Sequence, residues 1–576
     1  MTYKENLKKW QDKNDLEPVL KVELEELSGK EDELKSRFGS ILEFGTAGLR
    51  GTMGVGPNRM NIYTVRYATQ GLANFISSKG DDAKKAGVVI ACDSRNNSDL
   101  FSKEAARVLA ATGIKVYLFE SLRPTPELSF AVRYLHCTAG INITASHNPK
   151  EYNGYKAYWS DGAQLAPELA NEVMSAIVSI DIFDDVHLID IDDGIKSGII
   201  SIIGKEIDDE FIKAVLSQSV SGSFVKEFGK NLGIVYTPFH GAGYHLVPEV
   251  LSKAGFSNVT TVPEQMVLDG NFPTVKNPNP SDIRGFALAK DLAEKCGAQL
   301  IIGTDPDADR VVGLAKNNSG KFEPFTGNQM GVLLLNYIIE AGRENGTLPK
   351  NPALIKSIVS TYMVDAICEK NGVSVFNVLT GFKYIGELAN KFYETGSHSF
   401  ILGFEESCGY LTGNYARDKD AVLGALLISE MALYYKQKGL TLWDVLNRLY
   451  KEYGCFVEYT LDASVSGLDA ADKIKNIVSS LRENIPSAIS GVNVSEVTDL
   501  LTSETKNKLT GKVSKSDLPV SNVIIIRLSD NSNIIIRPSG TEPKVKLYFF
   551  VKSETIEDAN KKISEYQADM KTIMGL

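Results

Sequence analysis

Short apolar segments alternate with amphipathic ones along most of the chain. In the N-terminal third the apolar segments lie at 88–92, 115–119 and 141–145, and helical repeats separate them at 98–112 and 125–138. Short apolar runs bounded by polar residues are typical of buried strands, and a repeat near 3.6 residues is typical of helices. This order predicts a mostly parallel sheet covered by helices.

The same alternation returns twice, and then the pattern changes near residue 445. The later predicted strands are 232–236, 298–302, 353–359, 373–378 and 399–402, with helices at 244–254, 282–296, 362–370 and after Gly381. Beyond them, Ser529-Asp-Asn-Ser is a hairpin-turn signal between two apolar segments, and a strand at 544–551 precedes a helix at 554–574. We therefore predict an α/β chain of three similar α/β domains and a C-terminal α+β domain, with bounds 1–205, 206–317, 318–445 and 446–576.

The composition narrows the possible functions. The 62 basic and 72 acidic residues give a net charge of −10 and a pI near 5.4, which argues against a nucleic-acid-binding protein. No apolar run approaches the 18 residues of a membrane helix, and residues 421–435, interrupted by Glu430, are predicted to form a buried core helix. A local basic pocket for a small anion remains compatible with this composition.

The cysteines and the N-terminal sequence indicate a reducing compartment. The nearest two of the six cysteines, Cys368 and Cys408, are 40 residues apart, so a C-x-x-C metal or redox pair is absent. The first residues are polar and charged, unlike a secretory signal. We expect a cytoplasmic protein with free thiols and no membrane partner.

Four loops at the ends of predicted strands carry candidate chemistry, because ligands of α/β sheets bind beyond the carboxyl ends of strands. The first is Thr144-Ala-Ser-His-Asn-Pro, followed by Lys156. The Ser146 hydroxyl could carry a phosphoryl group, with His147 or Lys156 in the proton and charge role. The alternative is a polar turn with Lys156 on the surface, and the motif taken alone favours this alternative, because Ser-His-Asn is common.

The second loop, Asp305-Pro-Asp-Ala-Asp-Arg310, places three carboxylates at alternate positions after a strand. We expect an extended segment in which Asp305, Asp307 and Asp309 point the same way. Clustered like charges repel unless a cation lies among them, and oxygen ligands suit Mg²⁺. The sequence therefore predicts a magnesium site here rather than a solvated acidic turn.

The last two loops carry groups suited to sugars and phosphates. In Gly403-Phe-Glu-Glu-Ser, Glu405 and Ser407 are expected on one side of an extended loop, where they could bind neighbouring sugar hydroxyls. Alone, an acidic loop without a ligand is an equal alternative. Arg537-Pro-Ser-Gly-Thr offers a guanidinium group, two hydroxyls and free backbone N–H groups, which favours an anion site over a simple hairpin connection.

Two histidines lie near another glycine-containing turn. His240 and His245 flank Gly241-Ala-Gly. Two such side chains are too few for a metal site, so we interpret them as structural.

The four loop motifs, with Phe44-Gly-Thr-Ala-Gly-Leu-Arg-Gly, closely resemble those of the α-D-phosphohexomutase superfamily, in its phosphoglucomutase/phosphomannomutase branch. They occur in the order of that family and span about residues 44 to 544. The resemblance implies a heart-shaped enzyme of four domains with a central active site, acting on small sugar phosphates as a monomer or weak dimer. It also implies Mg²⁺ as cofactor and glucose 1,6-bisphosphate as intermediate and activator.

The resemblance assigns roles to individual residues. Ser146 would be the phosphoserine and would share Mg²⁺ with the three aspartates, and the phosphoserine oxygen would complete the metal site. Arg50, His147 and Lys156 would assist phosphoryl transfer. The residues expected to bind substrate are Arg310, Lys383, Glu405, Ser407 and Lys419, and those expected to hold the phosphate that is not transferred are Arg537, Ser539, Gly540 and Thr541.

The resemblance narrows the preferred sugar without fixing it. The Glu-Glu-Ser loop resembles that of glucose-preferring members, which implies interconversion of glucose 1-phosphate and glucose 6-phosphate. Mannose phosphate and pentose phosphate as substrates, and synthesis of glucose 1,6-bisphosphate, remain alternatives. A sugar-phosphate-binding relative without turnover is the non-enzyme alternative, and a haloacid-dehalogenase-type phosphatase fits less well because Arg310 and Val311 follow the aspartates.

Overall fold

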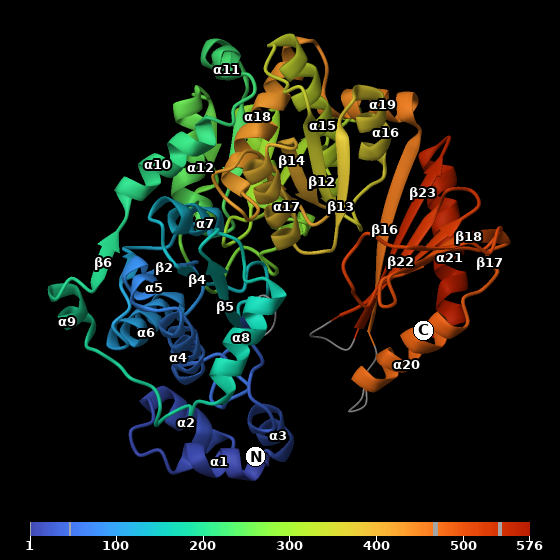
Figure 1. Cartoon of the computed structure of the whole chain (residues 1–576). Helices are drawn as coiled ribbons and strands as arrows, with labels where there is room; N and C mark the ends of the chain where they lie inside the picture. Colours follow the sequence, from blue (N-terminus) through green and yellow to red (C-terminus); the bar gives the residue numbers. More distant parts are fainter. Residues whose placement is uncertain (1, 45–47, 465–469, 540–543) are drawn as a thin grey trace.

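The computed structural model describes residues 2–44, 48–464, 470–539 and 544–576, and in it four sheets follow one another along the chain (Figure 1). Helices cover the first three sheets, and the C-terminal sheet lies apart from the N-terminal helices. The expected fold class, three α/β units with mixed sheets and an α+β unit, is confirmed.

The first sheet carries the expected parallel strands and two antiparallel strands at one edge. Its strands in spatial order are β1 (Leu49–Thr52), β5 (Tyr152–Trp159), β4 (Ala139–Ile143), β2 (Val88–Cys92), β3 (Val116–Phe119) and β6 (Ile200–Ile203). The associated helices are α1 (Tyr3–Gln11), α2 (Pro18–Glu26), α3 (Glu31–Phe38), α4 (Ile62–Ser78), α5 (Asp81–Ala86), α6 (Ser98–Ala111), α7 (Thr125–Tyr134), α8 (Pro167–Val178) and α9 (Ile191–Lys196). The antiparallel edge matters for function because β5 brings Lys156 beside the loop after β4.

The second sheet combines three parallel strands with an antiparallel extension. Its order is β11 (Phe322–Pro324), β10 (Val311–Lys316), β9 (Leu300–Thr304), β7 (Ile234–Thr237) and β8 (Val259–Thr261). Its helices are α10 (Lys205–Leu216), α11 (Gly222–Phe228), α12 (Gly243–Ala254), α13 (Pro263–Met266) and α14 (Ala287–Cys296), with 3₁₀ turns η1 (Gly229–Asn231) and η2 (Ile283–Phe286). The proposed domain boundary at 317 thus lies between two strands of this sheet.

The third sheet is short and the fourth is long and antiparallel. The third has the order β13 (Ser374–Val378), β12 (Pro352–Ser357), β14 (Ser399–Glu405), β15 (Gly409–Leu411), with helices α15 (Gly327–Glu344), α16 (Met363–Asn371), α17 (Phe382–Thr395), α18 (Ala421–Gln437) and α19 (Leu442–Tyr453). The fourth has the order β16 (Cys455–Ser464), β23 (Lys544–Ser553), β22 (Asn533–Pro538), β21 (Ile524–Leu528), β18 (Val492–Asp499), β19 (Glu504–Asn507), β20 (Val513–Lys515), with β17 (Ala488–Ile489) on β18 and helices α20 (Ala470–Glu483) and α21 (Ile556–Met574).

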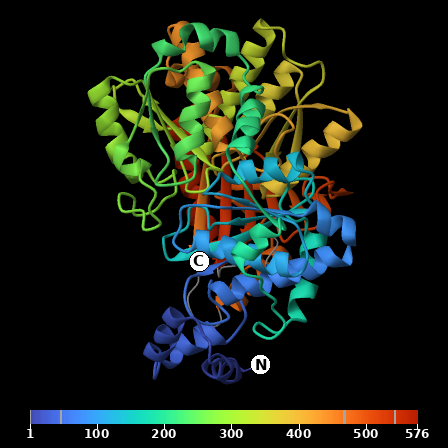
Figure 2. The same cartoon turned by 90° about the vertical axis from the view of Figure 1, so that its left-hand side faces the viewer.

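The buried apolar residues join the first three units into one core. A single cluster runs from one face of the first sheet, with Val89 and Leu128, through the strands of the second sheet and α12, α15 and α18 to α19. The other face of the first sheet and the N-terminal helices share a separate cluster, in which Trp10 packs edge-on against Tyr63 and Phe183. A small cluster that includes Ile358, Leu500 and Phe550 joins the third unit to the last sheet. Figure 2 shows the chain turned by 90° from Figure 1, with the N-terminal helices below the sheets.

Helix α18 is a buried core helix, as its apolar sequence predicts. Its one charged residue within the buried part, Glu430, is fully buried and accepts hydrogen bonds from the Ser219 hydroxyl, the Val220 amide (3.0 Å) and the Tyr337 hydroxyl (3.2 Å). Burial raises the pKa of Glu430 to about 7. Among the described residues, no helix combines the length and apolar character needed to cross a bilayer.

We expect a Glu430→Gln variant to gain stability relative to the wild type as the pH rises from about 4.5 to above 7. The unfolded chain ionises Glu430 first, so its contribution to stability is present below pH 4.5 and is lost through pH 7, a change of about 3 kcal/mol. Thermal unfolding from pH 4.5 to 8 measures this, with Glu227→Gln on exposed α11 as the control. A difference between Glu430→Gln and wild type that stays constant with pH would contradict a protonated Glu430.

Candidate active site

Ser146 lies at the start of the loop after β4 and has a left-handed backbone conformation, with φ of +51°. Its amide donates to the Thr144 hydroxyl (2.8 Å), and its own hydroxyl donates to Asp305 Oδ2 (2.9 Å). His147 Nδ1 lies 3.2 Å from the same hydroxyl. The serine side chain, which is buried, thus faces a carboxylate delivered by a different sheet.

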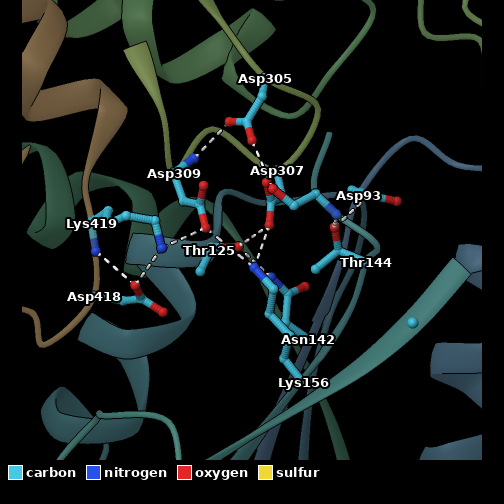
Figure 3. Close-up of polar contacts among 12 residues, drawn as sticks. Asp93, Thr125, Asn142, Thr144, Lys156, Asp305, Asp307, Asp309, Asp418 and Lys419 are labelled. Atoms are coloured by element: carbon cyan, nitrogen blue, oxygen red, sulfur yellow. Dashed lines mark hydrogen bonds and ion pairs between the residues drawn. The ribbon is translucent and has the colours of Figure 1, made fainter. Parts of the chain in front are cut away.

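The three aspartates come from the turn after β9 and not from an extended segment, so the expected alternation is wrong in detail. Ala308 has a positive φ of 50°, and its amide donates to the Asp305 carbonyl (3.0 Å). The Asp305 carboxylate closes the turn by accepting the amides of Asp309 (3.1 Å) and Arg310 (3.0 Å). The turn, rather than strand geometry, makes the carboxylates converge (Figure 3).

The converged carboxylates have the donor set of a site for a hard cation. Oxygens of Asp305, Asp307 and Asp309 all lie within 4.8 Å of one another, and the three side chains are buried. Asp307 Oδ1 and Asp309 Oδ1 are buried without a hydrogen-bond partner in the described part of the chain. Buried carboxylate oxygens without partners are costly, and a bound divalent cation removes that cost. The residues therefore fit Mg²⁺.

Two lysines bind the Oδ2 atoms of Asp307 and Asp309. Lys156 Nζ donates to Asp307 Oδ2 (2.7 Å) and Asp309 Oδ2 (3.2 Å), and Lys419 Nζ lies 3.0 Å from Asp309 Oδ2. Lys156 is buried on β5, so the alternative of a surface lysine is wrong. Asp418 Oδ1 holds Lys419 in turn (3.0 Å). These contacts are drawn in Figure 3.

The lysines divide the cluster into two electrostatic halves. Burial opposes the charge of Asp309, yet Lys419, Lys156 and Arg310 together lower its pKa. Burial and then the neighbouring Asp307 and Asp309 raise the pKa of Asp305 well above its usual value. The poorly compensated carboxylate is thus the one in contact with Ser146. Asp305 is thus the carboxylate of the cluster whose negative charge is least balanced by nearby positive charge.

The remaining residues expected near Ser146 also surround it. Arg50, on β1, donates from Nη1 to Asn148 Oδ1 (3.3 Å) in the serine loop. Arg310 Nε lies 3.7 Å from Asp309 Oδ1. Burial, followed by Arg310 and Arg50, lowers the pKa of His147 well below its usual value, so its ring is neutral at neutral pH.

Glu405 and Ser407 lie at the tight β14–β15 turn, so the expectation of an extended loop is wrong there. Glu405 ends β14, and Cys408, with φ of +68°, reverses the chain. The Gly381 amide donates to Glu405 Oε1 (2.8 Å) and so brings the half-buried Lys383, at the start of α17, near this turn. Burial lowers the pKa of Lys383.

Of the predicted phosphate-binding residues, Arg537 belongs to the last sheet and Ser539 follows its strand β22. Arg537 lies near the end of β22 and interacts with Tyr548 on β23 and electrostatically with Tyr384 beside Lys383. The Ser539 amide donates to the Lys544 carbonyl (2.8 Å). Gly540 and Thr541 lie outside the described residues, as do positions 45–47 of the N-terminal motif.

Several residues of this site were not identified from the sequence. Thr125, at the start of α7, bonds Asp307 through both its hydroxyl (2.9 Å to Oδ2) and its amide (2.9 Å to the carbonyl). Asp93 and Arg95 follow β2 and contact the serine loop, and Asp418 positions Lys419. Asp93-Ser-Arg is a polar segment directly after a predicted strand, the same signal that identified the other four loops.

The environments of His240 and His245 agree with a structural role. His240 is buried, with Nδ1 2.7 Å from the Val267 carbonyl and Nε2 2.8 Å from the Thr274 hydroxyl. His245 lies on α12, with Nε2 3.3 Å from Glu249 one turn along. The segment between them supports the aspartate turn, because the Ala242 amide donates to the Pro306 carbonyl (2.7 Å).

Comparison with known proteins places these features in a family. Three family models match, described as Phosphoglucomutase/phosphomannomutase, alpha/beta/alpha domains I, II and III, over residues 42–182, 209–319 and 326–453. Curated relatives named phosphoglucomutase include one from Staphylococcus saprophyticus, 38% identical over 92% of this chain and 94% of the relative. Another from Staphylococcus aureus (strain MRSA252) is 39% identical over 92% and 93%.

Solved structures share the fold. A phosphoglucomutase of Paramecium, parafusin in its open form, has a TM-score of 0.68 at 17% identity and covers 93% of this chain and 96% of its own. A putative phosphomannomutase of Thermus thermophilus has a TM-score of 0.65 at 21% identity, with 91% and 99% covered. The chain belongs to the phosphoglucomutase/phosphomannomutase family.

Proposed function

We propose that the chain catalyses the reversible interconversion of α-D-glucose 1-phosphate and glucose 6-phosphate through a phosphorylated Ser146. The observation that carries this proposal is the buried contact between the Ser146 hydroxyl and the three-aspartate cluster (2.9 Å to Asp305). A hydroxyl beside a cation site and several basic side chains suits a phosphoryl carrier. Relatives matched over nine-tenths of the chain and named phosphoglucomutase support glucose as the sugar.

The proposed reaction has two transfers. Phosphoserine 146 gives its phosphoryl group to the free hydroxyl of the sugar monophosphate, so that glucose 1,6-bisphosphate forms. After this intermediate turns around, the Ser146 oxygen receives the other phosphoryl group. In the first transfer the proton of the sugar hydroxyl passes to the departing Ser146 oxygen, and in the second the Ser146 proton passes back to the departing sugar oxygen. We assign this relay to His147, because its Nδ1 lies 3.2 Å from the Ser146 hydroxyl, whereas the Lys156 ammonium is engaged by two carboxylates. The Ser146 proton, which is donated to Asp305 here, would turn to His147 for that step.

Asp305, Asp307 and Asp309 would hold Mg²⁺ together with a phosphoserine oxygen, and the ion would supply charge neutralisation for the transferring group. Lys156 and Lys419 bind the Oδ2 atoms of Asp307 and Asp309, which leaves their Oδ1 atoms without a hydrogen bond and able to bind the ion. Arg50 and Arg310 add positive charge on the phosphate side.

Substrate contacts would come from the third and fourth units. Glu405 and Ser407 would bind sugar hydroxyls, and Lys383 and Lys419 would bind the substrate's polar groups. Arg537, Ser539, Gly540 and Thr541 would hold the phosphate that is not transferred. The contact of Glu405 with the Gly381 amide, which links two of these loops, supports a shared subsite.

We further propose that the protein works in the cytoplasm on small sugar phosphates, as a monomer or weak dimer. Six free cysteines, five of them buried, are compatible with a reducing compartment.

A competition between substrates tests the proposed function. Glucose 1-phosphate, mannose 1-phosphate and ribose 1-phosphate are offered together with Mg²⁺ and a trace of glucose 1,6-bisphosphate, and phosphorus NMR follows each. We expect the glucose 1-phosphate signal to convert first. Faster conversion of ribose 1-phosphate or mannose 1-phosphate would overturn the assignment of glucose as the preferred sugar. If none of the three sugar phosphates is converted, the proposal that the protein is a mutase is overturned.

Ser146→Ala tests the phosphoryl carrier. We expect mutase activity to fall by at least about 10³-fold with no loss of fold, because no other hydroxyl replaces the acceptor. Intact-protein mass spectrometry after incubation with glucose 1,6-bisphosphate should show one added phosphoryl group in the wild type and none in the variant. Ser160→Ala, in the exposed turn after β5, is the control. Near-normal activity of Ser146→Ala would contradict the mechanism.

Asp305→Asn tests the cation site. The asparagine carbonyl can still accept the Asp309 and Arg310 amides, so the turn is retained while one negative charge is lost. We expect the Mg²⁺ concentration for half-maximal activity to rise by about tenfold or more, and calorimetric Mg²⁺ binding to weaken in parallel. Asp291→Asn, exposed on α14, should match the wild type. Unchanged Mg²⁺ binding by Asp305→Asn would place the ion elsewhere.

A further inference from the structure

Arg95, in the turn after β2, binds through its side chain the backbone of the serine loop, residues 144–152. Its Nη2 donates to the carbonyls of Ser146 and Asn148 (2.5 Å each), and its Nη1 donates to those of Pro149 (2.9 Å) and Tyr152 (3.1 Å). The Arg95 side chain has no solvent exposure. One planar guanidinium group thus donates hydrogen bonds to four carbonyl oxygens of the loop that carries the candidate phosphoserine.

The loop requires such a restraint because its conformation is unfavourable in isolation. A non-glycine residue in the left-handed region is strained, and Ser146 is held there with φ of +51°. Four converging carbonyl dipoles repel one another unless a donor lies among them. The guanidinium group satisfies both needs, since it compensates the dipoles and fixes the turn.

Asp93 extends the restraint to the other side of Ser146. Asp93 Oδ2 lies 3.2 Å from Arg95 Nε and accepts the Thr144 hydroxyl (2.6 Å), which in turn accepts the Ser146 amide (2.8 Å). Asp93 Oδ1 accepts the Arg95 amide (2.9 Å) and the Ser98 hydroxyl (2.8 Å). The peptide groups on both sides of Ser146 therefore connect to one buried ion pair.

The second unit covers this ion pair. The Phe272 ring lies 5.2 Å from the Arg95 guanidinium carbon, and Asn271 accepts a hydrogen bond from Asn96 (3.1 Å). At Gly270 a Cβ atom would lie 2.3 Å from the Asn96 amide nitrogen, so only glycine permits this close approach. The serine loop is thereby positioned against the unit that carries the three aspartates.

We propose that Arg95 is a positioning residue for phosphoryl transfer, which holds the Ser146 loop so that the hydroxyl meets the aspartate cluster. The role goes beyond the proposed function and rests on it, because Arg95 acts through the loop backbone and not on the substrate. A displacement of the serine by about 1 Å would reduce transfer on the order of 10²-fold without weakening substrate binding.

Arg95→Lys is the test. Lysine keeps the positive charge beside Asp93, but its single ammonium group cannot donate hydrogen bonds to all four carbonyls as the planar guanidinium group does. We expect kcat to fall on the order of 10²-fold while KM for glucose 1-phosphate stays within about threefold. Hydrogen exchange of the peptide 144–152 should accelerate. The matched control is Arg66→Lys, which alters a partly buried pair with Glu104 (2.5 Å) between α4 and α6 of the same unit.

The two measurements separate the possible outcomes. If Arg95→Lys behaves like Arg66→Lys in both kcat and exchange, the inference is overturned, as it is if stability falls but kcat and exchange do not change. If the wild type itself lacks mutase activity, the proposed function fails while hydrogen exchange still tests the restraint. Phe272→Leu provides a second variant should Arg95→Lys not fold, with a smaller acceleration of loop exchange expected.

Discussion

The site depends on how the fold holds the negative charges of three buried aspartates close together. Three buried carboxylates within 4.8 Å of one another are unstable as anions without positive charge close by. Lys156 and Lys419 compensate the half formed by Asp307 and Asp309, and the fold delivers them from two other units. The half that contacts Ser146 lacks such a lysine partner in the described structure, and this asymmetry leaves negative charge beside the serine that a cation would balance.

The first three sheets supply the groups of the site, most of them from loops at strand ends. The first provides Ser146 and, on the antiparallel strand β5, Lys156, and the second provides the aspartate turn. The third provides Glu405 from the end of β14, and Lys419 precedes its helix α18. Because every group is fixed by its own sheet, the geometry of the site is set by how the units pack.

The sequence alone was sufficient for the fold class and for the loops, because short apolar strands and polar strand ends are local signals. It was insufficient for β5, where buried Asn153 and Lys156 interrupt the pattern of a strand. It also predicted an extended aspartate segment, since the left-handed Ala308 that makes the turn carries no composition signal. The contacts of Arg95 are with backbone carbonyls, which any residue could supply, so no side-chain pattern reveals them.

The shared core of the first three units has a mechanical consequence. Rotating these units against one another would expose a continuous apolar interior that includes α12 and α18, which opposes such a rotation. The last sheet meets the third unit through a much smaller apolar cluster around Ile358, Leu500 and Phe550. A rotation of the last sheet would therefore expose the least apolar surface at that junction, and it would change the distance between Arg537 and the aspartates.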